Sequence, residues 1–218
     1  MLSGLLETNV SSKQRTFFET LVQGVLLFPE TPTLRTIWDV TTHGPERFRE
    51  DINQLPPNLQ NFFWKEWHTY SETRGEAQWR LRGLFNKTHL ARMFSATKTR
   101  FDIGEQMQEG KVIVIDNSQA KCTREGCGFL GRFFISQIWL AGTQRHLLPD
   151  HMKKPTFVYI DEAHVVIKKD PKIADIIDEL RSARIGLVLA HQKLRGQIDD
   201  LHVQSSLENC AIKMVTQE

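Results

Sequence analysis

The sequence predicts an α/β protein in which an all-helical part precedes a parallel sheet. From about residue 11 to residue 100, apolar side chains recur at helical spacing and almost no strand pattern is present. From Gly110 onward, short apolar runs of strand type alternate with helical segments, and this alternation is typical of a parallel α/β sheet. We place the two domains at residues 1–105 and 106–218.

Turn signals divide the helical part into several predicted helices. Phe17, Leu21, Val25 and Phe28 recur at helical spacing and mark the first helix, which ends at the turn Pro29-Glu-Thr-Pro32. Further helices are expected at residues 33–41, 45–53 and 58–70. Thr73-x-x-Glu76 has the form of a capping box before a helix over residues 77–94. The many aromatic side chains of this part are expected to form its core.

The second part is expected to contain strands at residues 111–115, 156–160, 185–190 and 211–215. Phe157 to Ile160 form a continuous apolar run, which predicts a parallel strand buried on both faces. Apolar residues at helical spacing between Pro171 and Leu180 predict a helix that connects this strand to the next. A strand–helix–strand unit of this length should form a right-handed parallel crossover.

The most informative residues follow the 156–160 strand. Asp161 and Glu162 would lie at the carboxyl edge of the sheet, where open α/β folds bind ligands. Gln192 follows the 185–190 strand and should therefore lie at the same edge. Two neighbouring carboxylates repel each other. Their presence at this edge is therefore expected to serve a bound cation or a catalytic role. The alternative interpretation is a strand that ends in an ordinary acidic surface dipeptide.

The order of these motifs resembles a known family. An apolar strand, Asp-Glu-Ala, a helix, Leu-Arg-x-Ala-Arg and Gly-Leu-Val-Leu-Ala-x-Gln occur together in conjugative coupling proteins (TraG/TraD-like) and in HerA/FtsK-type DNA-translocating ATPases. Residues 110–116 resemble the preceding core strand of that family, and residues 131–139 the helix after it. Residues 2–13 are similar to the entry of its helical insertion. The resemblance implies that residues 106–218 form the Walker B half of a RecA-like P-loop NTPase core.

The resemblance also implies roles for individual residues. Asp161 would hold Mg²⁺, Glu162 would act as the catalytic carboxylate, and Gln192 would be the sensor glutamine. Arg181 or Arg184 would stabilise charge across a subunit interface in a ring-shaped homo-oligomer. Of the two arginines, Arg181 is favoured for this role by its position. ATP and Mg²⁺ are the implied cofactors, and DNA is the implied partner. The alternative for the two arginines is a solvated helix end, where cations are favourable.

The phosphate-binding loop of such ATPases is missing from this sequence. The only Gly-Lys pair, Gly110-Lys111, is followed by Val112, and Glu105 stands where the first glycine of the motif belongs. We therefore expect the chain to be a fragment or split part of a motor, inactive alone, whose Walker A half is supplied elsewhere. One alternative is a non-catalytic interaction or regulatory module with a degenerate NTPase fold. Another is a dinucleotide-binding protein, because Gly126, Gly128 and Gly131 spell G-x-G-x-x-G.

A basic segment gives a candidate nucleic-acid interface. Residues 74–100 contain seven basic side chains against the single acid Glu76, and Trp79, Phe85 and Phe94 lie among them. Such a face can bind DNA through phosphate contacts and base stacking. The candidate contacts are Arg74, Arg80, Arg82, Lys87 and Arg92. The alternative is an amphipathic helix with core aromatics and solvated arginines.

Composition limits the remaining choices. Apolar residues make up 40% and charged residues 25% of the 218 residues, as in ordinary globular proteins. No apolar run approaches the about 18 residues of a membrane span, and the first residues lack the basic leader of a signal peptide. Three cysteines, an odd number, favour a reducing compartment, so we expect a cytoplasmic protein. Cys122 and Cys127 are interpreted as ordinary thiols because no second pair of zinc ligands accompanies them.

Overall fold

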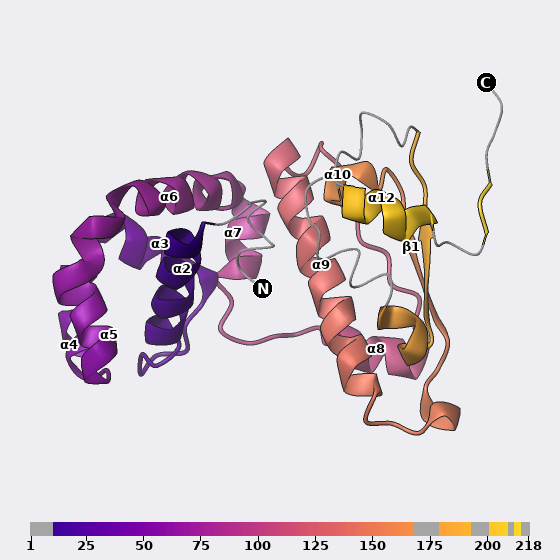
Figure 1. The fold of residues 1–218 in the computed structure, drawn as a ribbon, viewed down its shortest axis with the longest axis horizontal. Coiled ribbons are helices and arrows are strands. Elements are labelled where there is room, and N and C mark those ends of the chain that lie inside the picture. Colours follow the sequence, from indigo (N-terminus) through magenta and orange to yellow (C-terminus); the bar gives the residue numbers. More distant parts are fainter. Residues whose placement is uncertain (1–10, 168–178, 193–200, 209–211, 215–218) are drawn as a thin grey trace. The chain divides into compact units, whose positions relative to one another are not determined.

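The computed structural model describes residues 11–167, 179–192, 201–208 and 212–214. The chain divides into two compact units, and the division falls between Arg100 and Phe101. The first unit is helical, and the second combines helices with a small parallel sheet (Figure 1). The coarse prediction of an α/β chain with a preceding helical part is therefore confirmed. No helix within the described ranges is long and apolar enough to cross a membrane.

The helical unit begins with a well-capped helix. Helix α2 (Ser12–Val25) carries a capping box, in which the Ser11 hydroxyl accepts from the Gln14 amide and the Gln14 side chain accepts from the Ser11 amide. A second box, formed by Thr33 and Thr36, starts α3 (Leu34–His43). The elements that follow are η1 (Pro45–Phe48), α4 (Arg49–Asn53), α5 (Pro57–Asn61), η2 (Phe62–Glu66), η3 (Trp67–Tyr70), α6 (Ser71–Phe85) and α7 (Thr88–Phe94).

Aromatic side chains form the core of this unit, as expected. Phe17 is fully buried, and its ring lies within 6 Å, centroid to centroid, of the rings of Phe18, Phe62, Trp67 and Tyr70. Such tilted and edge-to-face pairs add to the free energy that the buried area itself contributes. Two details of the sequence prediction are wrong. Thr73 lies inside α6 and is buried, so it caps no helix, and the single helix predicted over residues 77–94 is instead divided between α6 and α7.

The second unit is built around one long helix. Its elements are α8 (Ile103–Glu109), α9 (Arg124–Arg145), η4 (Asp150–Met152), β1 (Thr156–Ile160), α10 (His164–Ile167), η5 (Arg181–Ala183), β2 (Ile185–Leu189) and α12 (Leu201–Glu208). Glycines let α9 pack closely. A Cβ on Gly131 would lie 2.7 Å from Val166 Cγ2, and a Cβ on Gly142 would lie 2.7 Å from Leu180 Cδ2. The predicted helix over residues 171–180 falls mainly outside the described residues.

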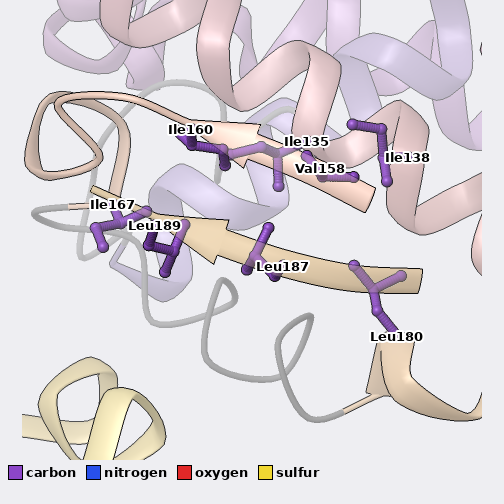
Figure 2. A pocket seen from close by; sticks show the side chains of 8 residues that line it. All are labelled: Ile135, Ile138, Val158, Ile160, Ile167, Leu180, Leu187 and Leu189. Carbon is purple, nitrogen blue, oxygen red and sulfur yellow. The ribbon is translucent and has the colours of Figure 1, made fainter. Parts of the chain in front are cut away.

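Strands β1 and β2 pair in parallel, as predicted. Their register joins Thr156 to Ile185 at one end and Ile160 to Leu189 at the other. One face of the pair packs on α9, where Ile135 and Ile138 point towards aliphatic side chains of both strands (Figure 2). The gap between them is apolar and only about 10 Å³, far too small for a ligand, whose pockets are typically about 300 Å³ or more. This face is core.

The other face of the pair is exposed, contrary to the prediction of a strand buried on both sides. Burial alternates along β1, and Phe157 and Tyr159 are 65% and 74% exposed. Val188 on β2 is also exposed. Alternating burial is ordinary for antiparallel sheets, whereas parallel sheets occur almost only with both faces covered. The continuous apolar run could not reveal this difference, because it is equally hydrophobic on both faces.

Two of the predicted strands are not found. Residues 111–118 form neither helix nor strand; Ile113 packs on the core while Val112 is 93% exposed. Residues 212–214 form no strand either, while Ala211 and Val215 lie outside the described residues. Gly110, with φ of +77°, caps the C-terminus of α8, so the Gly110-Lys111 pair follows a helix instead of opening one. The apolar pattern correctly identified residues with strand propensity, but a strand also requires a neighbouring strand with which it can pair.

Asp116, near the end of the 111–118 segment, lies in a local turn. Its Oδ1 accepts from the Ser118 amide at 3.1 Å, and the Lys121 ammonium donates to Oδ2. The hydrogen bond from Lys121, followed by those from Ser118, lowers the pKa of the Asp116 carboxyl to about 2.

We predict that the Asp116 carboxyl titrates near pH 2, and that Lys121→Met raises this midpoint towards the ordinary aspartate pKa of about 3.9. Because the folded pKa is depressed, the stabilising effect of this turn is present above about pH 4 and is lost as pH falls towards 2. A ¹³C-detected NMR titration of the carboxyl carbon measures both midpoints. Identical midpoints in wild type and variant would show that Lys121 does not hold this carboxylate.

Candidate functional site

The carboxyl ends of β1 and β2 bring the candidate residues together. The Ala190 amide donates to the Ile160 carbonyl at 3.0 Å, and the Ala163 amide donates to the Ala190 carbonyl at 2.9 Å, so the pairing continues by one hydrogen-bonded step, in which Ala163 lies three residues after β1. Beyond that step, Gln192 Nε2 donates to Glu162 Oε1 at 2.9 Å. Thirty positions along the chain separate these two residues. The strand order predicted their common edge, and the structure adds the direct hydrogen bond.

Glu162 occupies a strained backbone position. Its φ is +46°, in the left-handed region that non-glycine residues rarely adopt. Such a residue costs on the order of 1–3 kcal/mol and persists only where surrounding contacts fix it. Here Asp161 Oδ1 accepts from the Glu162 amide at 2.9 Å, and the Glu162 carbonyl accepts from the Val165 amide at 2.9 Å. These two hydrogen bonds hold the turn that contains Glu162.

Two histidines accompany the candidate residues, and the sequence interpretation assigned neither a role: His164 follows the acidic pair, and His191 precedes Gln192. His164 Nδ1 is 3.2 Å from Glu162 Oε2, without the alignment of a hydrogen bond. Both atoms are buried and have no other hydrogen-bond partner in the described part of the chain, and the same holds for His191 Nδ1. His164 stands three positions after Asp161 in the motif, so its position could have been noticed, but its contact depends on the turn at Glu162.

The residues present fit a magnesium site only in part. Asp161 is exposed, and one of its carboxylate oxygens remains beyond the bond from the Glu162 amide. Mg²⁺ is commonly held by one or two carboxylates, waters and substrate phosphates, so one aspartate suits that donor set. No group of three or more His, Cys, Asp or Glu side chains gathers into a metal cage among the described residues. Asp161 could thus hold Mg²⁺ together with a phosphate ligand.

The two candidate arginines lie at the opposite edge of the sheet. The Arg184 carbonyl accepts from the Thr156 amide at 3.0 Å, which places Arg184 where both strands begin. A five-residue strand spans about 16 Å, so the structure does not bring Arg184 to the acidic pair of the same chain. Arg181 starts η5 just before it, and its side chain lies outside the described residues. Action in another subunit stays a prediction for both arginines.

Arg145 is a buried arginine that the sequence pattern did not indicate. Its Nη1 donates to the Lys154 carbonyl at 2.9 Å and to the Ala183 carbonyl at 3.5 Å, joining the segments that lead into β1 and β2. The side chain is only 4% exposed, and burial lowers the pKa of its guanidinium. It stands in the last turn of α9, where a cation is also favourable. Arg145 therefore helps to fix the two strands that carry the candidate site.

The glycine motif lies in a different setting from a dinucleotide site. Gly126, Gly128 and Gly131 are inside the first turns of α9, and residues 111–118 before them form no strand. The dinucleotide fingerprint requires its glycines in the turn between a strand and a helix. Around this motif, the described residues do not provide that turn. Close packing against Val166 accounts for Gly131.

The candidate DNA-binding residues divide into exposed and packed side chains. Arg82 on α6 and Arg92 on α7 are exposed, whereas Arg74, Arg80 and Lys87 are partly buried. The Arg74 guanidinium lies 4.9 Å from the Trp67 ring centroid, and burial lowers its pKa. Of the aromatics in this segment, Phe85 packs against Trp38, but Trp79 is 68% exposed. The structure thus leaves Trp79 and Arg82, one helical turn apart on α6, available to a ligand.

Comparison of the chain with protein-family models, with curated proteins and with solved structures gives no match.

We predict that Arg145→Met lowers the free energy of unfolding by about 1–3 kcal/mol, because two backbone carbonyls lose their buried donor. The exposed neighbour Gln144 provides a matched control: Gln144→Met should change stability by no more than about 0.5 kcal/mol. Urea denaturation followed by circular dichroism measures both. Equal stability of the two variants would mean that Arg145 does not join the strands.

Proposed function

We propose that this chain is the Walker B part of an ATP-driven DNA-translocating motor that resembles the conjugative coupling proteins. The observation that carries the proposal is the hydrogen bond between Gln192 and Glu162. It joins a polar residue after one parallel strand to a carboxylate after the neighbouring strand. In this proposal, the carboxylate pair and the amide at this edge supply the metal-binding and water-orienting groups of a site for phosphoryl transfer.

Each polar group of the edge has a chemical task in this proposal. Asp161, with an open carboxylate oxygen, would hold Mg²⁺, which when bound would bridge and neutralise nucleotide phosphates. Glu162 would orient and polarise the attacking water. Gln192 bears no charge, so it can contact both Glu162 and a phosphate without adding repulsion. Ring assembly would then bring Arg181 or Arg184 of a neighbouring subunit to the transferring phosphoryl group.

The phosphate cradle has to come from outside this sequence. No Gly-x-x-x-x-Gly-Lys-Ser/Thr occurs in it, and the Gly110-Lys111 pair ends a helix. A further chain segment or subunit that carries the Walker A loop would add strands to the two-stranded sheet and helices over its exposed face. The exposed apolar residues Phe157, Tyr159 and Val188 support such an addition, because parallel sheets are normally covered on both faces.

A non-catalytic interaction module is the second candidate. The same exposed apolar face favours it, since a degenerate core could retain a docking surface without turnover. The two candidates differ in whether Asp161 and Glu162 are needed for anything beyond stability.

We predict that the isolated chain hydrolyses no ATP and binds it at best in the millimolar range, on the order of 4 kcal/mol. Once a Walker A-bearing partner completes the site, Glu162→Gln should keep ATP bound but slow turnover by about 10²-fold or more. Asp161→Ala should also weaken magnesium-dependent binding.

Calorimetry and a phosphate-release assay measure these quantities, and Glu109→Gln, which removes an exposed charge from α8, is the matched control. Micromolar ATP binding by the isolated chain would contradict the partial-motor proposal. Full turnover by the completed Glu162→Gln protein would remove Glu162 from the mechanism, whereas no turnover by the completed wild-type protein would favour the interaction module.

We predict that the helical unit contributes to DNA binding through Trp79 and Arg82. Trp79→Ala should weaken single-stranded DNA binding by about 1–3 kcal/mol, the usual value of one base stacked on an aromatic ring. Arg82→Gln should weaken it and flatten its salt dependence. Arg35→Gln is the control, because Arg35 is exposed but already paired with Asp39. Fluorescence anisotropy at two salt concentrations measures all three, and unchanged affinity of both test variants would remove this face from the function.

A further inference from the structure

The Glu162 carboxylate is approached from two sides by nitrogen-bearing side chains. Gln192 donates to Oε1 at 2.9 Å, while the imidazole of His164 lies 3.2 Å from Oε2. Oε2 and His164 Nδ1 are both buried, and neither has another hydrogen-bond partner in the described part of the chain. A buried polar atom without a partner is costly, so these two atoms are the natural partners of each other.

The backbone turn makes this contact possible. Residues two apart do not face each other on a regular helix. Here Glu162 has a φ of +46°, and His164 is the first residue of α10. The Val165 amide bonds the Glu162 carbonyl, and the Ala163 amide bonds the Ala190 carbonyl on the strand β2 side. The left-handed residue therefore turns the chain so that the side chains of Glu162 and His164 meet.

The chemistry of the pair specifies where the imidazole carries its proton. A neutral histidine has one N–H donor and one acceptor nitrogen. If Nδ1 were the acceptor, its lone pair would face the carboxylate oxygen and the contact would be repulsive. With the proton on Nδ1, a small rotation of the ring aligns a hydrogen bond to Oε2. His164 and Gln192 would then each donate to one oxygen of the same carboxylate.

We propose that His164 is a positioning residue, which fixes the orientation of the Glu162 carboxylate against Gln192. The purpose of this positioning rests on the proposed function, because Glu162 needs a fixed orientation only if it directs an attacking water. The contact itself needs neither nucleotide nor metal. Without His164, Oε2 loses its partner and the carboxylate can rotate away from Gln192.

NMR spectroscopy of the full 218-residue chain tests the proposal without any ligand. Long-range ¹H–¹⁵N spectra at about pH 9, where histidine side chains are neutral, report which ring nitrogen is protonated. The His164 signals are identified by their loss in His164→Asn. In the wild-type chain we expect the proton on Nδ1.

The second readout is the side-chain amide of Gln192. Its proton bonded to Glu162 should resonate downfield, and His164→Leu, which has no donor, should remove that shift. His164→Asn places an N–H close to the position of Nδ1 and should restore it, although both variants lose the ring. Backbone amide signals of the helical unit should stay unchanged in both variants.

A wild-type His164 protonated on Nε2 alone would overturn the proposal, and this measurement uses a variant only to identify the signals. An unchanged Gln192 signal in His164→Leu, or a failure of His164→Asn to restore it, would also overturn it. Since no readout involves ATP, failure of the partial-motor proposal would leave these results intact. Their failure would likewise not decide whether Asp161 binds magnesium.

Discussion

The parallel pairing of β1 with β2 is the interaction on which the candidate site depends. The register joins Ile160 to Leu189, and the pairing continues through Ala190 and Ala163. Because the strands end level with each other, side chains that follow them meet even though thirty positions separate Glu162 from Gln192. A slip of one residue would reverse the faces of the strand, exposing Val158 and Ile160 and burying Phe157 and Tyr159.

The core on one side of the sheet maintains this register. Ile135 and Ile138 of α9 pack against aliphatic side chains of both strands, and Gly142 allows the helix to approach Leu180 closely. At the other end of the strands, Arg145 donates to the carbonyls of Lys154 and Ala183. Apolar packing thus determines which face of the sheet is buried, and the buried guanidinium of Arg145 joins the two segments at its amino edge.

Both edges of the sheet are polar and strained, since Arg184 at the amino edge has a φ of +56° and Arg145 Nη2 is buried without a hydrogen-bond partner in the described part of the chain. Glu162 has a positive φ, and buried nitrogen and oxygen atoms of His164 and Glu162 lack aligned partners. Strain and unsatisfied polar groups reduce stability, and they concentrate at functional sites. The carboxyl edge differs from the amino edge in the direct side-chain hydrogen bond between Gln192 and Glu162, which joins the ends of two neighbouring strands.

The sequence by itself determined the helical character of residues 11–100, the two paired strands and the shared edge of Asp161, Glu162 and Gln192. These features follow from periodicity and from the chirality of parallel crossovers, which are local or nearly local properties. The resemblance to coupling proteins is also a property of the sequence, and the roles that it implies remain predictions.

Tertiary structure alone decided the remaining features. Residues 111–115 have a strand-like sequence but no partner, because a ladder depends on a second strand and not on propensity. The exposed face of Phe157 and Tyr159 depends on which elements cover the sheet, and the position of Arg184 at its amino edge depends on the register. The contact of His164 with Glu162 depends on one left-handed residue, because a single φ angle sets the direction of both side chains.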